Sequence, residues 1–140
     1  MRLSHWRATA PNPESLGATV ESAVVAVLTS LGAEPDPDCW ILWGDDPTVR
    51  WFLMTPTRAG LLEVNVRVNV TQEGPRAAGK LVRWSRVQIG DFQVEAPSGH
   101  RLLSFQIESH VLHAVDAECE AMAAFIQGIF AAVDGFRPAP

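Results

Sequence analysis

The sequence predicts an α+β domain in which an antiparallel meander sheet of five or six strands is flanked along the chain by an N-terminal and a C-terminal helix. Three observations predict this class. Apolar and polar residues alternate strictly from Leu61 to Val70, which is the two-residue period of a strand with one buried face. Near each end of the chain, apolar residues recur every three or four positions, as on an amphipathic helix. The connections between strands are short, which favours antiparallel neighbours.

Size and composition favour one cytoplasmic domain. The 140 residues suit a single domain, 1–140, with flexible tails at 1–11 and 136–140. A net charge of -5 argues against a general affinity for nucleic acid or an anionic membrane. No segment reaches the roughly 18 apolar residues of a membrane span, and no secretory signal is visible. Ten arginines against one lysine are typical of a GC-rich, bacterial genome.

The N-terminal helix is predicted to begin at Asn12-Pro13-Glu14, because Asn is a good N-cap, Pro fits the first helical position and Glu suits the helix dipole. Gly32 is the expected C-terminal stop. The apolar stripe between them consists of Leu16, Val20, Ala23, Val24, Val27, Leu28 and Leu31.

The first half of the sheet is predicted as three strands, at Trp40–Trp43, Val49–Thr55 and Leu61–Val70. The second of these is apolar on both sides, which is typical of a central strand or of one covered by a partner. One side carries Val49, Trp51 and Leu53, and the other carries Phe52 and Met54.

The second half of the sheet follows a polar loop at Thr71–Gly79. A strand is predicted over Lys80–Ile89, with a β-bulge at Ser85–Arg86 where the apolar phase reverses. Gly90-Asp91 fits a two-residue hairpin turn. The last two strands are predicted at Phe92–Glu95 and Leu103–Ile107, separated by a turn at Pro97–Gly99.

The C-terminal helix is predicted to begin at the N-cap Ser109 and to end at Gly135. Both helices must bury their stripes on the sheet, and the simplest solution places both on one face. The stripe consists of Val111, Val115, Cys119, Met122, Ile126, Ile129 and Val133.

More apolar strand surface is present than two helices can cover, which indicates a partner. The predicted interface consists of Trp51, Phe52, Met54, Phe125 and Phe130. We therefore expect a homodimer, which also has the means to bind another protein.

A weaker pattern predicts a metal site. His110, His113 and Asp116 step by three residues at the start of the predicted C-terminal helix, and imidazole and carboxylate groups are zinc or iron ligands. The alternative is the polar side of an amphipathic helix, since the H-E-x-x-H pattern is absent. Cys39 and Cys119 match no metal spacing and are predicted to be free thiols. No cofactor is predicted.

Basic residues on the strands suggest an anion site. Arg50, Arg67 and Arg83 are expected on the open sheet face, where they would hold an anion; the alternative is scattered surface arginines. Gly74–Lys80 has the spacing of a phosphate-binding loop, but Leu81 replaces the required hydroxyl and a strand follows instead of a helix. We expect an ordinary hairpin loop there.

The helix–meander–helix order resembles, at the level of the fold, small bacterial secretion-chaperone-like and profilin-like domains, although no motif carries a family. The sequence therefore predicts a non-enzymatic, homodimeric protein-interaction or chaperone-like module. The alternative is a small-ligand or metal-binding domain with its site between the sheet and the C-terminal helix.

Overall fold

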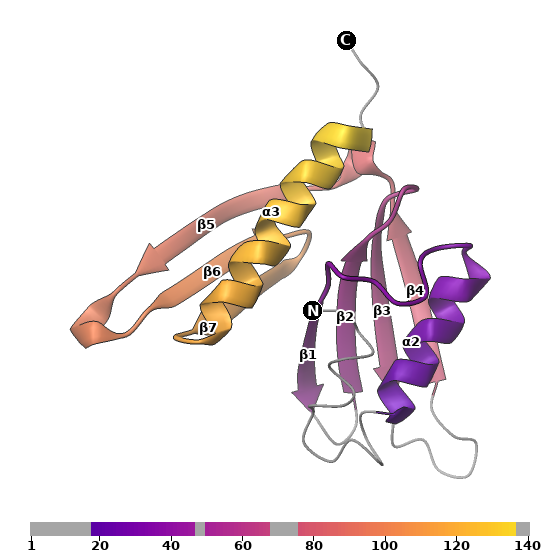
Figure 1. Ribbon diagram of the computed structural model, residues 1–140, viewed down its shortest axis with the longest axis horizontal. Coiled ribbons are helices and arrows are strands. Elements are labelled where there is room, and N and C mark those ends of the chain that lie inside the picture. The colour runs from indigo at the N-terminus through magenta and orange to yellow at the C-terminus, as the bar shows by residue number, and fades with distance from the viewer. Residues whose placement is uncertain (1–17, 47–49, 68–75, 137–140) are drawn as a thin grey trace. The chain divides into compact units, whose positions relative to one another are not determined.

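The computed structural model describes residues 18–46, 50–67 and 76–136 (Figure 1). The fold is α+β, as predicted, and its described strands form two antiparallel sheets, one of four strands and one of three. The chain divides into two compact units, Met1–Leu81 and Val82–Pro140. Each unit has its own helix, sheet and buried side chains.

The first unit contains one described helix and the four-stranded sheet, in the order β1-β2-β3-β4. Its elements are α2 (Ala18–Ser30), β1 (Ile41–Asp46), β2 (Arg50–Pro56), β3 (Leu61–Arg67) and β4 (Arg76–Val82).

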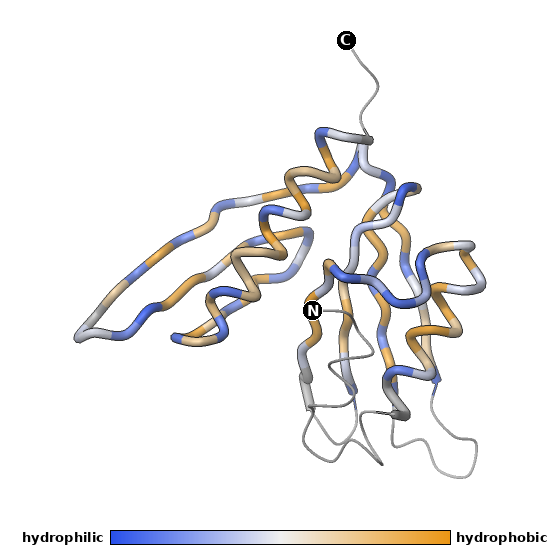
Figure 2. The backbone as a smooth tube through the Cα atoms, in the orientation of Figure 1, coloured by the Kyte–Doolittle hydropathy of each residue, from blue (hydrophilic) through white to orange (hydrophobic). Residues whose placement is uncertain are grey.

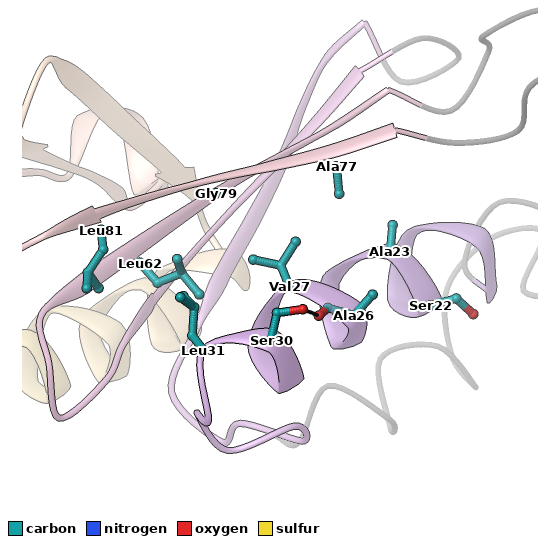
Figure 3. A pocket seen from close by; sticks show the side chains of 10 residues that line it. All are labelled: Ser22, Ala23, Ala26, Val27, Ser30, Leu31, Leu62, Ala77, Gly79 and Leu81. Atoms are coloured by element: carbon teal, nitrogen blue, oxygen red, sulfur yellow. Dashed lines mark hydrogen bonds between the residues drawn. The ribbon is translucent and has the colours of Figure 1, made fainter.

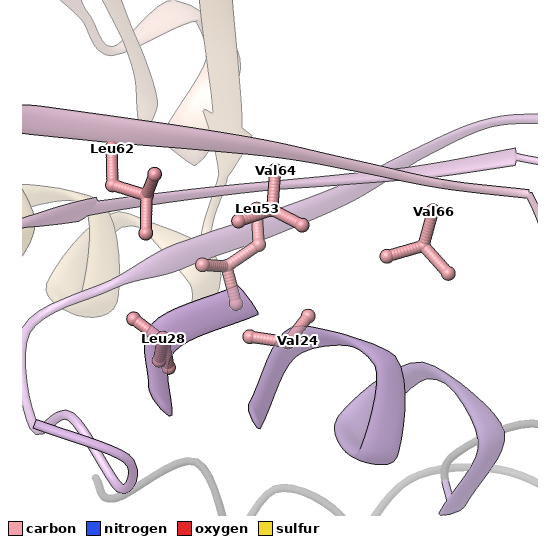
Figure 4. Close-up of a cluster of buried hydrophobic side chains, with 6 residues drawn as sticks. All are labelled: Val24, Leu28, Leu53, Leu62, Val64 and Val66. Atoms are coloured by element: carbon pink, nitrogen blue, oxygen red, sulfur yellow. The ribbon is translucent and has the colours of Figure 1, made fainter. Parts of the chain in front are cut away.

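The predicted alternation along β3 is confirmed and builds the core of this unit. Val64 and Val66 are completely buried, while Arg67 is exposed. Val64 lies opposite Leu53 of β2, so both side chains share the sheet face that packs against α2. Figure 4 shows the resulting cluster, to which α2 contributes two residues one helical turn apart. Its members are Val24, Leu28, Leu53, Leu62, Val64 and Val66.

Gly32 ends α2, as predicted. Its φ of +67° is the left-handed conformation that glycine adopts without a Cβ penalty. The backbone N–H of Ala33 donates to the carbonyl of Leu28 at 2.9 Å, and that of Gly32 donates to Thr29 at 3.1 Å. This is a Schellman motif, which satisfies the last helical carbonyls.

The second unit contains a three-stranded sheet in the order β5-β6-β7 and one long helix. Its elements are η2 (Trp84–Arg86), β5 (Ile89–Glu95), η3 (Pro97–Gly99), β6 (Leu102–Ile107), β7 (His110–Val115) and α3 (Glu118–Phe136).

The helix α3 packs on β6 and β7. The centre of this core is Phe105 of β6, which is completely buried and lies opposite Phe92 of β5 and Leu112 of β7. The helix contributes a stripe of buried residues at three- and four-residue steps. They are Cys119, Met122, Phe125, Ile126, Ile129 and Val133.

Hydrogen bonds fix the start of the strand β5, and a β-bulge follows. Gln88 and Glu108 exchange two hydrogen bonds, from the N–H of Glu108 to the Gln88 carbonyl (2.8 Å) and from the N–H of Gln88 to the Glu108 carboxylate (2.7 Å). The pairing with β6 then shifts between Ile89 and Phe92, so β5 has one extra residue there.

The prediction of one meander sheet is wrong. β4 and β5 belong to different sheets, and each described helix covers its own sheet rather than a shared face. Alternation identifies a strand, but its partner is decided by contacts far along the chain. A 3₁₀ turn at Trp84–Arg86 separates the two strands, where the sequence predicted a bulge inside one strand over Lys80–Ile89.

Two further local predictions in this region are corrected. The loop predicted over Thr71–Gly79 is partly strand, because β4 begins at Arg76. Gly90-Asp91 is the bulge of β5 and not a hairpin turn. Both glycine-containing segments carry turn chemistry, but a glycine inside a strand also marks a bulge.

The C-terminal helix begins later than predicted. His110–Val115 is the strand β7, and Glu108 and Ser109 form the turn before it, with Glu108 at a φ of +54°. The residues of β7 fit both a two-residue and a three- to four-residue period. Pairing with β6 favours the strand over a helix, because Leu112 and Ala114 of the strand are then buried together.

Some predictions concern residues outside the described ranges. These are the helix start at Asn12, the tail at 1–11, most of the tail at 136–140, and the last part of the strand at Leu61–Val70. The single domain over 1–140 stays a prediction. In the described ranges, no helix combines the length and apolar character that crossing a membrane would need.

The cluster in Figure 4 gives a prediction for stability. Leu53→Ala will lower the free energy of unfolding by about 2–5 kcal/mol, because it removes a completely buried side chain and leaves a cavity. Urea denaturation followed by circular dichroism measures this loss. The control Leu31→Ala removes the same atoms from a side chain that is 52% exposed, and we expect less than about 1 kcal/mol. Equal losses at both positions would contradict the assignment of Leu53 to the core.

Candidate functional site

The second unit leaves a row of apolar side chains exposed beside its core, which we call the apolar strip and define as Phe92, Val94 and Phe130. Phe92 and Val94 lie opposite the buried Phe105 and Leu103, so both point to the face that α3 covers. Phe130 packs edge to face on Phe105, with ring centroids 6.3 Å apart. The strip therefore flanks Phe105 on two sides.

The strip is exposed because α3 packs over β6 and β7 and leaves β5 beside it. Phe92 is 56% exposed, Val94 68% and Phe130 39%. Figure 2 shows hydrophobic and hydrophilic residues alternating along β5, which is the pattern of a half-buried strand. In β5, however, the apolar side chains Phe92 and Val94 are exposed to solvent and are not covered by α3. Exposed apolar side chains grouped on one face are typical of interaction sites.

The opposite face of this sheet also exposes apolar side chains. Val111 and Val115 of β7 are 55% and 46% exposed. They share their face with His113 and Gln106, which are polar and exposed. Because polar neighbours interrupt them, these two valines form a weaker surface than the apolar strip.

The first unit has a groove between α2 and β4, which we call the α2 groove (Figure 3). Its volume is about 620 Å³, and small side chains line it. Gly79 lies so close to the helix that a Cβ there would come within 2.9 Å of Val27 Cγ1. The groove is lined by Ser22, Ala23, Ala26, Val27, Ser30, Leu31, Leu62, Ala77, Gly79 and Leu81.

The structure separates the predicted interface residues. Trp51 is half-buried on the α2 face of the first unit, whereas Phe52 lies on the other face, where it stacks on Trp43 at a centroid distance of 5.4 Å. Met54 and Phe125 are buried in different units, so a partner would not reach them directly. Phe130 alone belongs to the apolar strip.

Sequence reasoning missed Phe92 and Val94. The alternation Phe92-Gln93-Val94-Glu95 was available, and it placed a strand there. What it does not show is that this strand lies at the edge of its sheet, beyond the width of the helix.

The structure places two of the three residues of the predicted anion site next to each other. Arg50 and Arg67 are direct cross-strand neighbours on β2 and β3, and the Arg50 guanidinium lies 5.8 Å from the centre of the Phe52 ring. Arg83 belongs to the other unit.

The predicted metal ligands are not brought together. Because β7 is a strand, His110 and His113 lie on opposite faces of the sheet. No group of three His, Cys, Asp or Glu side chains within the described residues is placed to hold a metal ion. Cys39 is half-buried and Cys119 is buried, and both are free thiols. Burial raises the pKa of the Cys39 thiol.

Asp116 instead links His100 and Arg101, which precede β6, to the first turn of α3. Its carboxylate accepts hydrogen bonds from the backbone N–H of Arg101 (2.9 Å) and from His100 Nδ1 (3.1 Å), and its own N–H donates to the Arg101 carbonyl. Its carbonyl accepts from the N–H of Cys119 in the first turn of α3. The bond from Arg101, then that from His100, lowers the pKa of Asp116 below its ordinary value of 3.8.

Comparisons with known protein families, curated proteins and solved structures found no match to this chain. The geometry of the two units is therefore the basis for the function proposed below.

The lowered pKa of Asp116 gives a prediction for acid stability. A carboxylate whose pKa is depressed on folding stabilises the protein above its unfolded pKa, and this stabilisation is lost as the pH falls through the folded pKa. Asp116→Asn keeps a residue that tolerates the φ of +50° but removes the charge. We expect the variant to be less stable than the wild type at pH 7 and equally stable well below pH 3.8. Urea denaturation from pH 7 to strongly acidic pH measures this difference; one that stayed constant would contradict the electrostatic explanation.

Proposed function

We propose that this protein is a non-enzymatic interaction module that self-associates as a homodimer and, through the same kind of surface, binds protein partners. The observation that supports it is the apolar strip beside Phe105. Three large apolar side chains lie together on one face, and they are 39–68% exposed. A soluble monomer rarely leaves such a group uncovered beside its core.

The position of the strip adds a second argument. Phe92 and Val94 belong to β5, which is one of the two outer strands of its sheet. An edge strand presents backbone N–H and C=O groups that a further strand can bond. Apolar side chains and an open backbone edge therefore lie on the same strand, which is the arrangement used in β-strand addition.

Covering the apolar strip contributes a moderate binding free energy. Covering one of these roughly half-exposed side chains contributes on the order of 1 kcal/mol. A symmetric dimer covers the strip of both copies, so each side chain contributes twice to the binding free energy. Strand hydrogen bonds and close packing would supply the rest of a micromolar affinity, which corresponds to about -8 kcal/mol.

Removal of the strip tests this proposal. The wild-type chain is expected to have the mass of a dimer in light scattering at tens of micromolar. Phe92→Thr combined with Val94→Thr keeps β-branched residues on the strand but removes apolar surface. We expect the dimer to weaken roughly tenfold or more, with an unchanged circular dichroism spectrum.

The matched control is Val111→Thr combined with Val115→Thr. These valines are comparably exposed but lie on the opposite face of the same sheet, so the dimer should persist. A wild-type chain that remains monomeric at hundreds of micromolar would refute self-association.

A further inference from the structure

Within the described residues, β4 is one of the two outer strands of the first sheet and β5 is one of the two outer strands of the second. These two strands are consecutive in the sequence, and both have seven residues. An open edge of this length is a template for another strand.

The two edges carry opposite charges at the same spacing. β4 carries Arg76 and Lys80, four residues apart, and no acidic residue. β5 carries Asp91 and Glu95, also four residues apart, and no basic residue. Like charges opposite each other destabilise strand pairs. Pairing β5 with another β5, or β4 with another β4, is thus disfavoured, and pairing β4 with β5 is favoured.

The shapes of the two edges are complementary as well. On the helix side, β4 lines the α2 groove with Ala77, Gly79 and Leu81, and the small size of the first two leaves the groove open (Figure 3). On the helix side, β5 presents Phe92 and Val94, which protrude. A glycine in a strand is stabilised when an aromatic residue of the neighbouring strand covers it.

One antiparallel register satisfies both kinds of complementarity. With Phe92 opposite Gly79, Val94 falls opposite Ala77 and Glu95 falls opposite Arg76. The same register brings Lys80 next to Asp91 at the bulge of β5. Apolar residues then lie on the helix side and charged pairs on the other side, as the two-residue period of a strand requires.

From these observations we infer that β4 of one copy pairs with β5 of a second copy, with Phe92 and Val94 filling the α2 groove of that partner. This inference rests on the self-association proposed above and identifies the surface that mediates it. In a twofold dimer the contact forms twice, because each copy offers one basic and one acidic edge. The groove volume of about 620 Å³ lies within the range that accommodates a drug-sized ligand, so two side chains fit.

Charge reversal at the two edges tests the inference. In the proposed register, Arg76→Glu places a carboxylate opposite Glu95 in every contact, and Glu95→Lys places an ammonium group opposite Arg76, while the pair of Lys80 and Asp91 is unchanged. Each variant alone is expected to dimerise roughly tenfold or more weakly than the wild type, because every contact then opposes like charges. Mixed in equal amounts, the two variants are expected to form a heterodimer in which both contacts again join opposite charges. Native mass spectrometry distinguishes this heterodimer from either homodimer.

The controls are Arg58→Glu and Glu120→Lys, which make the same charge changes at exposed positions of a turn and of α3. They should leave the dimer unchanged, alone and mixed. Variants of Arg76 and Glu95 that dimerise like the wild type, or that stay monomeric after mixing, would overturn this pairing but not self-association. A monomeric wild-type chain would refute self-association itself.

Discussion

The width of a helix limits how much of each sheet is covered. An α-helix with its side chains is about 10–12 Å across, and neighbouring strands are about 4.8 Å apart. One helix therefore covers roughly two strands. The second unit has three strands, and α3 packs on β6 and β7. In the first unit, α2 packs chiefly on β3 of a four-stranded sheet. Among the described residues, each sheet consequently keeps at least one strand whose helix-side face is not fully covered by its helix.

The two units meet this limit in different ways. In the first unit, the strand beside the helix carries small residues, so the uncovered region is the α2 groove. In the second unit, the strand beside the helix carries Phe92 and Val94, so the uncovered region is the apolar strip. The α2 groove is a hollow and the apolar strip is a projection, and both result from the limited width of one helix. In the pairing proposed above, their opposite edge charges favour contact between the hollow and the projection.

The sequence predicted local structure better than it predicted pairing. The alternation along Leu61–Arg67 and the stop at Gly32 are both confirmed, because they depend on neighbouring residues alone. The break between β4 and β5 was not predictable, since hydrogen bonding between strands depends on distant segments. The start of α3 was misplaced for a related reason. His110–Val115 fits two periods, and only the tertiary contacts of Leu112 and Ala114 distinguish them.

The candidate site shows the same limit. A covering partner was predicted from the excess of apolar residues, and the interface was assigned to large apolar residues of the second predicted strand and of the C-terminal helix. Met54 and Phe125 are buried, and the exposed surface falls on Phe92 and Val94. Size and hydrophobicity do not show which strand lies at an edge. That property appears only when the order of the strands is known.

The bulge in β5 has a consequence for the direction of this edge. In a regular strand, residues three apart point to opposite faces. Ile89 and Phe92 are three apart, yet both pair with residues of the same face of β6, because the bulge adds one residue between them. Gln88 is held by its two hydrogen bonds to Glu108, so the strand cannot slide to compensate. If the bulge straightened without a change in chain length, Phe92 and Val94 would turn away from the helix, and the sidedness of the whole edge would be inverted.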